Sequence, residues 1–483
     1  MKKLVSMLLV LSLLLGAASL ALAADAPVNL VWWVYTGSDA PIDAQLVQDA
    51  ANAYSAEKIG VTVDIQYKTQ EQLELAMGAG ENYDMTFTCE WANNFNRNAR
   101  DGMFADITDL LTTEAPALWA SLDPLFWEAA RIDGRIYAVP TKKDMGAEMF
   151  FRIDKDYYEG VLGMTIPDTM AFADIETYLA AFKADRPDEY PMMMGSGGLS
   201  GFTNFVQRVA GSTLVVPYEY AGTDKGTTII PFYEYPALVE RFELLHKWYG
   251  LGYIQPDAAT TDVVGQSIPT TVRSGSAWFG YDAAWSRWAG HGVKISRYDG
   301  PFMSTATMQG AMQAINAGAS DANKLAALKY MELVATDVAF RNILRYGVEG
   351  THFNYNDQGL VVRTEQGSSN FSMDGFVFGS VAIATVEAVE GWDVDPNMWD
   401  KVYAGYADAI VSDLGSFSFN SESVDAERSA VGAVWEKYAA EVYTGTSDPA
   451  VVLPQIKAEM EAAGILVVQA EAQRQLDEYL AAQ

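Results

Sequence analysis

The chain has 483 residues, of which 63 are acidic and 32 basic, and its formal net charge is −31. This surplus of negative charge argues against nucleic acid and anionic lipid as partners. Half of the residues are hydrophobic and 12% are aromatic, far more than a disordered acidic chain carries. Because a single hydrophobic core stops growing at about 250 to 300 residues, we expect two or more domains.

Residues 1–23 have the composition of a secretory signal peptide: two lysines near the start, an apolar run, and small residues ending at Ala23. No later run approaches the roughly 20 apolar residues of a membrane span. The single cysteine, Cys89, is too far along the chain to carry an N-terminal lipid, and it has no partner for a disulfide. We therefore expect an exported protein, periplasmic or extracellular, without a lipid anchor.

Strands and helices alternate in the first part of the chain. Leu30–Tyr35 forms an apolar run long enough for a buried parallel strand, residues 46–54 have apolar side chains at helical spacing, and Val61–Ile65 is typical of a second strand. A further strand is predicted at Met85–Thr88. Open α/β sheets bind ligands in the loops that follow parallel strands. The expected ligand loops are residues 35–40 and 89–94.

Residues 131–156 have the pattern of a crossing between two lobes. A turn at Asp133 and Gly134 is followed by a short β-rich run that Pro140 ends, and then by a new apolar strand from Met149. An ordinary hairpin followed by another strand is the alternative. Beyond this crossing, helices are predicted over residues 173–183, 235–251, 262–274 and 321–336, strands over 277–279 and 308–317, and C-terminal helices through Val431–Tyr438 and on either side of Gly464.

Five stretches occur in the order found in family 1 of the extracellular solute-binding proteins of ABC importers, and they resemble that family. They are residues 32–35 (Trp-Trp-Val-Tyr), 60–65 (Gly-Val-Thr-Val-Asp-Ile), 78–87, 102–111 and 345–353. The crossing at residues 131–156 resembles the hinge of these proteins. The C-terminal part resembles a subfamily of aldouronate- and oligosaccharide-binding lipoproteins with an extra C-terminal region, so the resemblance spans residues 28–480.

The resemblance implies an α/β, two-lobed (Venus-flytrap) periplasmic-binding-protein fold, type II-like, with mixed sheets flanked by helices and a helical C-terminal region. Lobe one is expected to contain residues 24–143 and 306–350, and lobe two residues 144–305 and 351–483. The expected crossings are residues 141–148, 305–309 and 348–353, about which ligand should favour a closed state. The implied function is capture of a carbohydrate, an oligosaccharide in particular, and its delivery to an ABC permease by a monomer without cofactor, metal or catalysis.

Two other classes of function stay open at this stage. A secreted glycoside hydrolase needs only two carboxylates about 5 to 9.5 Å apart, although no nucleophile-elbow, zinc-protease or phosphate-loop motif is present. An envelope sensor would present the same fold to a receptor. Residues 354–365 have the spacing of a calcium loop, but asparagine and glutamine replace two of its acids, which favours a β-hairpin turned at residues 356–359.

Saccharide clefts combine aromatic rings, which pack on sugar C–H faces, with planar polar side chains that bind hydroxyl groups. The predicted site combines side chains after strands of lobe one and at the first crossing (Trp33, Tyr35, Glu90, Trp91, Lys143) with side chains of lobe two (Tyr281, Asp282, Trp285). For any one of these tryptophans a place in the core is the alternative. If the ligand is a uronate, a local cation must offset the negative chain, and the best-placed cations are Lys142, Lys143 and Arg152.

Overall fold

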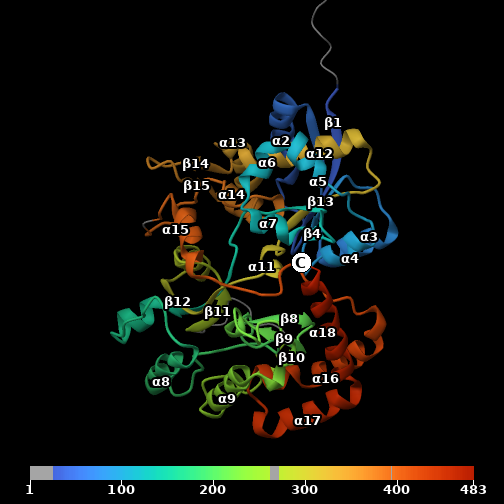
Figure 1. Ribbon diagram of the computed structural model, residues 1–483. Helices are drawn as coiled ribbons and strands as arrows, with labels where there is room; N and C mark the ends of the chain where they lie inside the picture. The colour runs from blue at the N-terminus through green and yellow to red at the C-terminus, as the bar shows by residue number, and fades with distance from the viewer. Residues whose placement is uncertain (1–25, 262–270, 393, 483) are drawn as a thin grey trace, which may run out of the picture.

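The computed structural model describes residues 26–261, 271–392 and 394–482. The predicted signal peptide lies outside these residues, as does most of the helix predicted over residues 262–274. The described chain forms two lobes, one above the other in Figure 1. Lobe one is built on the sheet that contains residues 28–35, and lobe two on the sheet that contains residues 147–154.

The sheet of lobe one has the strand order β2-β1-β3-β13-β6. β1 (Val28–Tyr35) is parallel to β2 (Val61–Lys68) and β3 (Met85–Thr88), whereas β13 (Met312–Ile315) is antiparallel to β3 and β6 (Ala138–Pro140). The predicted parallel strands are therefore confirmed. The late strand β13 lies between two early ones, so the chain must leave lobe one and return to complete its sheet.

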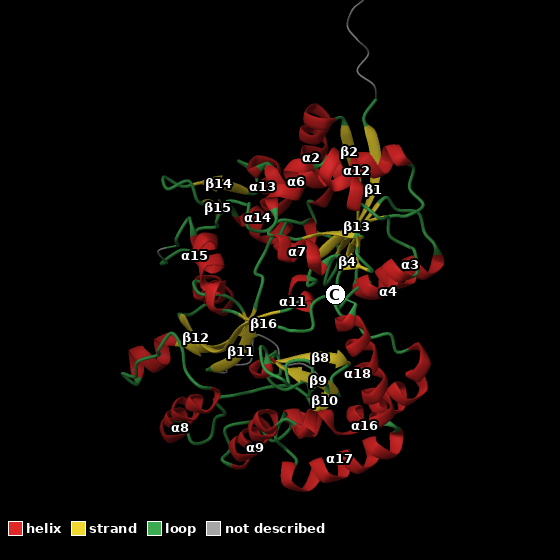
Figure 2. Cartoon of the chain, in the orientation of Figure 1, coloured by secondary structure: helices red, strands yellow, loops and turns green. Residues whose placement is uncertain are grey.

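Helices cover this sheet (Figure 2). Thr69 begins one of them with a capping box, in which its side chain accepts from the backbone N–H of Gln72. The helices of lobe one are α2 (Ala44–Ile59), α3 (Gln70–Ala79), α4 (Phe95–Arg100), α5 (Thr108–Glu114), α6 (Pro116–Ser121), α7 (Pro124–Ala129), α12 (Asp321–Thr336) and α13 (Val338–Tyr346), and the short pair β4 (Arg131–Ile132) and β5 (Arg135–Ile136) precedes β6. The helix predicted over residues 321–336 is confirmed.

Lobe two has a sheet in the order β11-β7-β12-β16 and an antiparallel sheet in the order β10-β9-β8. These strands are β7 (Ala147–Asp154), β8 (Val206–Ala210), β9 (Leu214–Pro217), β10 (Ile230–Pro231), β11 (Val272–Ser276), β12 (Val293–Met303) and β16 (Ile410–Val411). Its helices are α8 (Glu176–Asp185), α9 (Pro236–Gly250), α10 (Asp282–Ala289), α16 (Asp425–Tyr443), α17 (Pro449–Ala463) and α18 (Ile465–Ala481). The strand β11 replaces the end of the predicted 262–274 helix, and residues 277–279 follow it outside any strand.

The remaining elements lie between α13 and lobe two: β14 (Phe353–Tyr355), β15 (Val361–Arg363), α14 (Glu365–Asn370) and α15 (Met398–Ala404), with α11 (Thr305–Met308) at the second crossing. β14 and β15 form the predicted hairpin. The Asn356 side-chain oxygen accepts from the backbone N–H groups of Gln358 and Leu360, at 3.0 and 2.9 Å. That oxygen therefore closes a turn instead of binding a cation.

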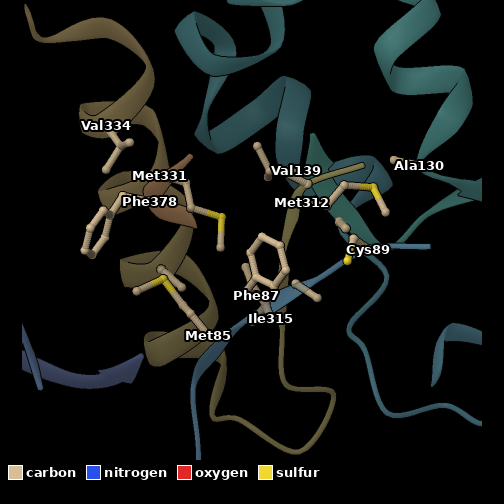
Figure 3. Close-up of a cluster of buried hydrophobic side chains, with 14 of the residues drawn as sticks. Met85, Phe87, Cys89, Ala130, Val139, Met312, Ile315, Met331, Val334 and Phe378 are labelled. Atoms are coloured by element: carbon tan, nitrogen blue, oxygen red, sulfur yellow. The ribbon is translucent and has the colours of Figure 1, made fainter. Parts of the chain in front are cut away.

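Core packing divides the C-terminal half differently from the sequence prediction, which assigned all of residues 351–483 to lobe two. Phe378 belongs to the core of lobe one, together with Phe87, Met312 and Met331 (Figure 3). Val377, Trp399, Val402 and Tyr406 also belong to this core, whereas the buried hydrophobic side chains of residues 414–476 belong to the core of lobe two. The third crossing therefore lies between α15 and β16, about 50 residues beyond the predicted 348–353.

Within the described residues, no helix combines the length and the apolar character needed to cross a membrane.

Candidate functional site: the interlobe cleft

A cleft of about 680 Å³ opens between the lobes. Its walls come from the loop after β3, from the first two crossings, from the start and outer face of α10, and from residues 374–399 before the third crossing. The side chains used below that line it are Glu90, Trp91, Lys143, Asp144, Trp278, Tyr281, Arg287, Trp288, Arg345, Phe376, Glu387 and Trp399. This volume lies within the usual range for a small-molecule pocket.

Trp91 presents an aromatic face from lobe one. Its ring is 39% exposed, and its indole N–H donates to the carbonyl of Gly310 on the second crossing at 2.9 Å. Tyr35 meets it edge to face at 4.9 Å between ring centroids, and Phe376 does so at 6.3 Å. These contacts hold the indole in one orientation while leaving surface on which a ligand can stack.

Helix α10 carries two tryptophans with opposite environments. Trp285 is 4% exposed, and the guanidinium of Arg152 lies 4.3 Å from its ring centroid. Trp288, three residues later, is 48% exposed and lines the cleft. Tyr281 contacts both rings, at 5.3 and 5.9 Å. The two rings lie on the same side of α10, and packing around the helix buries Trp285 while leaving Trp288 open to the cleft.

A further aromatic pair joins the lobes at the cleft. Trp278, which follows β11 in lobe two, lies 5.0 Å from Trp399 of α15 and 4.5 Å from Tyr281. Trp399 belongs to the core of lobe one. The contact therefore places a lobe-two ring against lobe one at the cleft wall.

Four of the eight charged side chains that line the cleft form ion pairs within the protein. Lys143 Nζ lies 3.1 Å from an oxygen of Asp144. Glu387 pairs with Arg287 of lobe two and, at 3.2 Å, with Arg363 of β15. Tyr281 is protonated at neutral pH, as burial raises its pKa further above the ordinary value, and its phenol can both donate and accept a hydrogen bond.

Buried Arg341 of α13 holds the loop that carries Phe376 into the cleft. Its guanidinium donates to the carbonyl oxygens of Ser380, at 2.6 Å, and of Gly375. Full burial lowers the pKa of this arginine to about 9. Gln313 of β13 ties the same loop to the sheet through a 3.0 Å bond to the carbonyl of Val377.

Four of the predicted site residues line this cleft: Glu90, Trp91, Lys143 and Tyr281. Tyr35 lies behind Trp91 and faces an adjoining pocket. Asp282 is the first residue of α10 and is half-buried outside the lining, and burial raises its pKa.

The structure contradicts the placement of Trp33 and Trp285 in the site. Trp33 is fully buried, packs on Tyr83 at 4.5 Å, and donates its indole N–H to Gln66 at 3.1 Å. Trp285 is buried as well. Two of the cations expected to bind a uronate are engaged within the protein. Arg152 packs on the ring of Trp285, and the charge of Lys143 is offset by Asp144.

The sequence prediction missed Trp278, Trp288, Phe376 and Trp399 among the aromatic lining residues. Helical spacing did not reveal Trp288, because residues three apart lie on the same side of a helix, and only the packing around α10 makes Trp285 buried and Trp288 exposed. Phe376 and Trp399 precede a crossing whose position the sequence did not reveal. Among the described residues, no group of three or more His, Cys, Asp or Glu side chains is arranged to hold a metal ion.

The two lobes, the crossings and the cleft give the chain the architecture of a two-lobed solute-binding protein. The resemblance stated from the sequence is confirmed at this level. A carbohydrate ABC transporter substrate-binding protein of Streptococcus pneumoniae serotype 4 is 28% identical over 474 residues, covering 95% of this chain and 92% of its own length.

Solved structures agree with this class. The N-glycan transport solute binding protein NgtS from Streptococcus pneumoniae has a TM-score of 0.83 at 26% identity, covering 94% of this chain and 99% of its own. Its complexes with Man1GlcNAc and Man5GlcNAc have TM-scores of 0.75 and 0.72, each at 25% identity and with the same coverage. A family described as a domain of unknown function, DUF3502, matches residues 413–481.

The two tryptophans of α10 give a direct test of this geometry. Trp285→Ala should lower the free energy of unfolding by about 3 to 5 kcal/mol, because it removes a buried ring and leaves a cavity. Trp288→Ala should change it by less than about 1 kcal/mol, since nearly half of that ring is already in water. Denaturant titration of the ligand-free variants measures both values, and equal losses would contradict the assignment of a buried and an exposed ring.

Proposed function

We propose that this protein captures a carbohydrate in the interlobe cleft and delivers it to the permease of an ABC importer. The observation that carries the proposal is the aromatic lining contributed by both lobes, with Trp91 on one side and Tyr281 and Trp288 on the other. Sugar rings pack their C–H faces on such surfaces. Paired arginine and carboxylate groups at the same wall supply donors and acceptors for hydroxyl groups.

An oligosaccharide is the ligand class that these features favour. Several rings spaced along one cleft provide more stacking surface than a single pyranose covers. The relative NgtS is described as an N-glycan transport protein and in complex with oligosaccharides, which supports the same class for this chain. The uronate alternative lacks an uncompensated cation at Lys143.

The protein acts by binding and closure. The TM-score is higher for the NgtS structure whose description names no ligand than for the two sugar complexes, which supports an open arrangement of the lobes here. Ligand that contacts both lobes lowers the free energy of the closed state alone. We further propose that the chain is exported and that it works as a monomer without a cofactor or a catalytic step.

Removing a cleft ring should weaken sugar binding specifically. With Man5GlcNAc as the first ligand tested, Trp91→Ala and Trp288→Ala should each lower the affinity about ten- to a hundredfold, because a stacked aromatic contact is worth on the order of 1 to 3 kcal/mol. Isothermal titration calorimetry measures the change.

Phe279→Ala is the matched control for these two variants, since Phe279 is 43% exposed and next to Trp278 but packs away from the cleft on Phe150. Its affinity should equal that of the wild type.

The glycoside hydrolase alternative is tested by incubating the sugar with the wild-type protein. The recovered sugar should be unchanged, and release of new reducing ends would favour the hydrolase.

Closure should be visible in solution. Small-angle X-ray scattering of the wild type should give a smaller radius of gyration with saturating sugar than without it, since both lobes then contact one ligand. A radius of gyration that stays the same at saturation would contradict closure. It would not contradict sugar binding, which calorimetry measures separately.

A further inference from the structure

The interlobe cleft continues into a second compartment of about 720 Å³. The two compartments share Glu90, Gln207, Arg208 and Ala306 in their linings. The second is as large as the first, and either alone has the volume of an ordinary ligand pocket. A ligand that fills only the aromatic compartment would leave the adjoining one to water.

The matched domain of unknown function builds one wall of this second compartment. Residues 414–422, at its N-terminal end, line the compartment opposite α4 of lobe one. The domain fixes this segment at two points: the backbone N–H of Ser416 donates to the Tyr479 hydroxyl at 3.0 Å, and that of Asn420 donates to Gln475 at 3.0 Å. The residues between these points, including Ser418, are thereby held at the compartment.

The segment also contacts lobe one and the second crossing. Arg100 of α4 donates to the Ser418 hydroxyl at 3.4 Å, and the Thr305 hydroxyl donates to the carbonyl of Gly415. The C-terminal domain, whose core packs with lobe two, thus closes one end of the cleft against lobe one.

The chemistry of the second compartment differs from that of the first. Its lining is rich in amide, hydroxyl and guanidinium groups, and Phe417 and Phe419 pack against the lobe-two core. The charge of the lining is close to balanced. Its acidic side chains are Glu90, Asp101 and Glu422, and its basic ones are Arg97, Arg100, Arg208 and Arg428. Of these, Arg428 is paired with Asp425 at 2.7 Å. Such a lining suits neutral hydroxyl-rich groups better than an anion.

We propose that the C-terminal domain forms a second sugar subsite, in which the polar compartment binds the further units of a neutral oligosaccharide whose first units stack in the aromatic compartment. This inference rests on the proposed function and names the ligand more narrowly. The chain then selects oligosaccharides that are long or branched enough to occupy both compartments. Affinity rises with ligand size because the added units make hydrogen bonds that short sugars cannot reach.

The test compares Man1GlcNAc with Man5GlcNAc by calorimetry on the full mature chain. The wild type should bind the larger sugar at least about tenfold more tightly, the equivalent of one or two hydrogen bonds. Ser418→Trp, which fills the polar compartment, should remove this advantage and leave the affinity for Man1GlcNAc within about twofold. Arg97→Ala, an exposed side chain of α4 that lines only the second compartment, should reduce the advantage without adding bulk.

Ser429→Trp is the control, because Ser429 is exposed on α16 of the same domain and lines neither compartment. It should leave both affinities unchanged. The second subsite is overturned if the wild type binds the two sugars equally, or if Ser418→Trp and Arg97→Ala weaken both sugars alike. Failure of either sugar to bind the wild type would contradict the proposed function itself, and the subsite with it.

Discussion

The position of β13 is the constraint on which the rest of the structure depends. In its register, Met312 faces both Thr88 at the end of β3 and Pro140 at the end of β6. The carboxyl ends of two strands and the start of the returning strand therefore meet at one point of the sheet edge. Both of the first two crossings leave from that point, and the loop with Glu90 and Trp91 follows β3 directly.

The crossings are bound to one another where they leave lobe one. The backbone N–H of Thr141 donates to the carbonyl of Ala311 at 3.0 Å, and the Thr307 hydroxyl donates to that of Met145 at 2.7 Å. Because these bonds join neighbouring connecting segments, the lobes can change their angle about a narrow hinge while each core stays packed. A cleft at the hinge is the place where a ligand gains most from contacting both lobes.

Sequence reasoning predicted the parts of this arrangement that depend on local periodicity. The apolar run of β1, the α12 amphipathic pattern and the hairpin about Asn356 are each fixed by residues close in the chain. The loop after β3 was predicted correctly as a cleft wall, since the end of a parallel strand is a general ligand position.

The parts that failed depend on packing between distant segments. Trp33 lies on the predicted strand, but Tyr83 packs against its ring. The spacing of residues along the strand does not distinguish this buried position from one that faces the cleft. The sequence prediction did not include helix α10, and it placed Trp285 in the site instead of Trp288. The third crossing was misplaced because Trp399 joins the lobe-one core from far along the chain, and this contact has no local signature.

The central claim is that one sugar ligand contacts both lobes through the aromatic lining. A crystal structure of the complex with an oligosaccharide that binds in calorimetry tests it most directly. The account predicts sugar rings stacked on Trp91 and on Trp288 or Tyr281, with the two lobes closed on the same ligand. A sugar bound on the outer face of one lobe, with these rings untouched, would contradict the account.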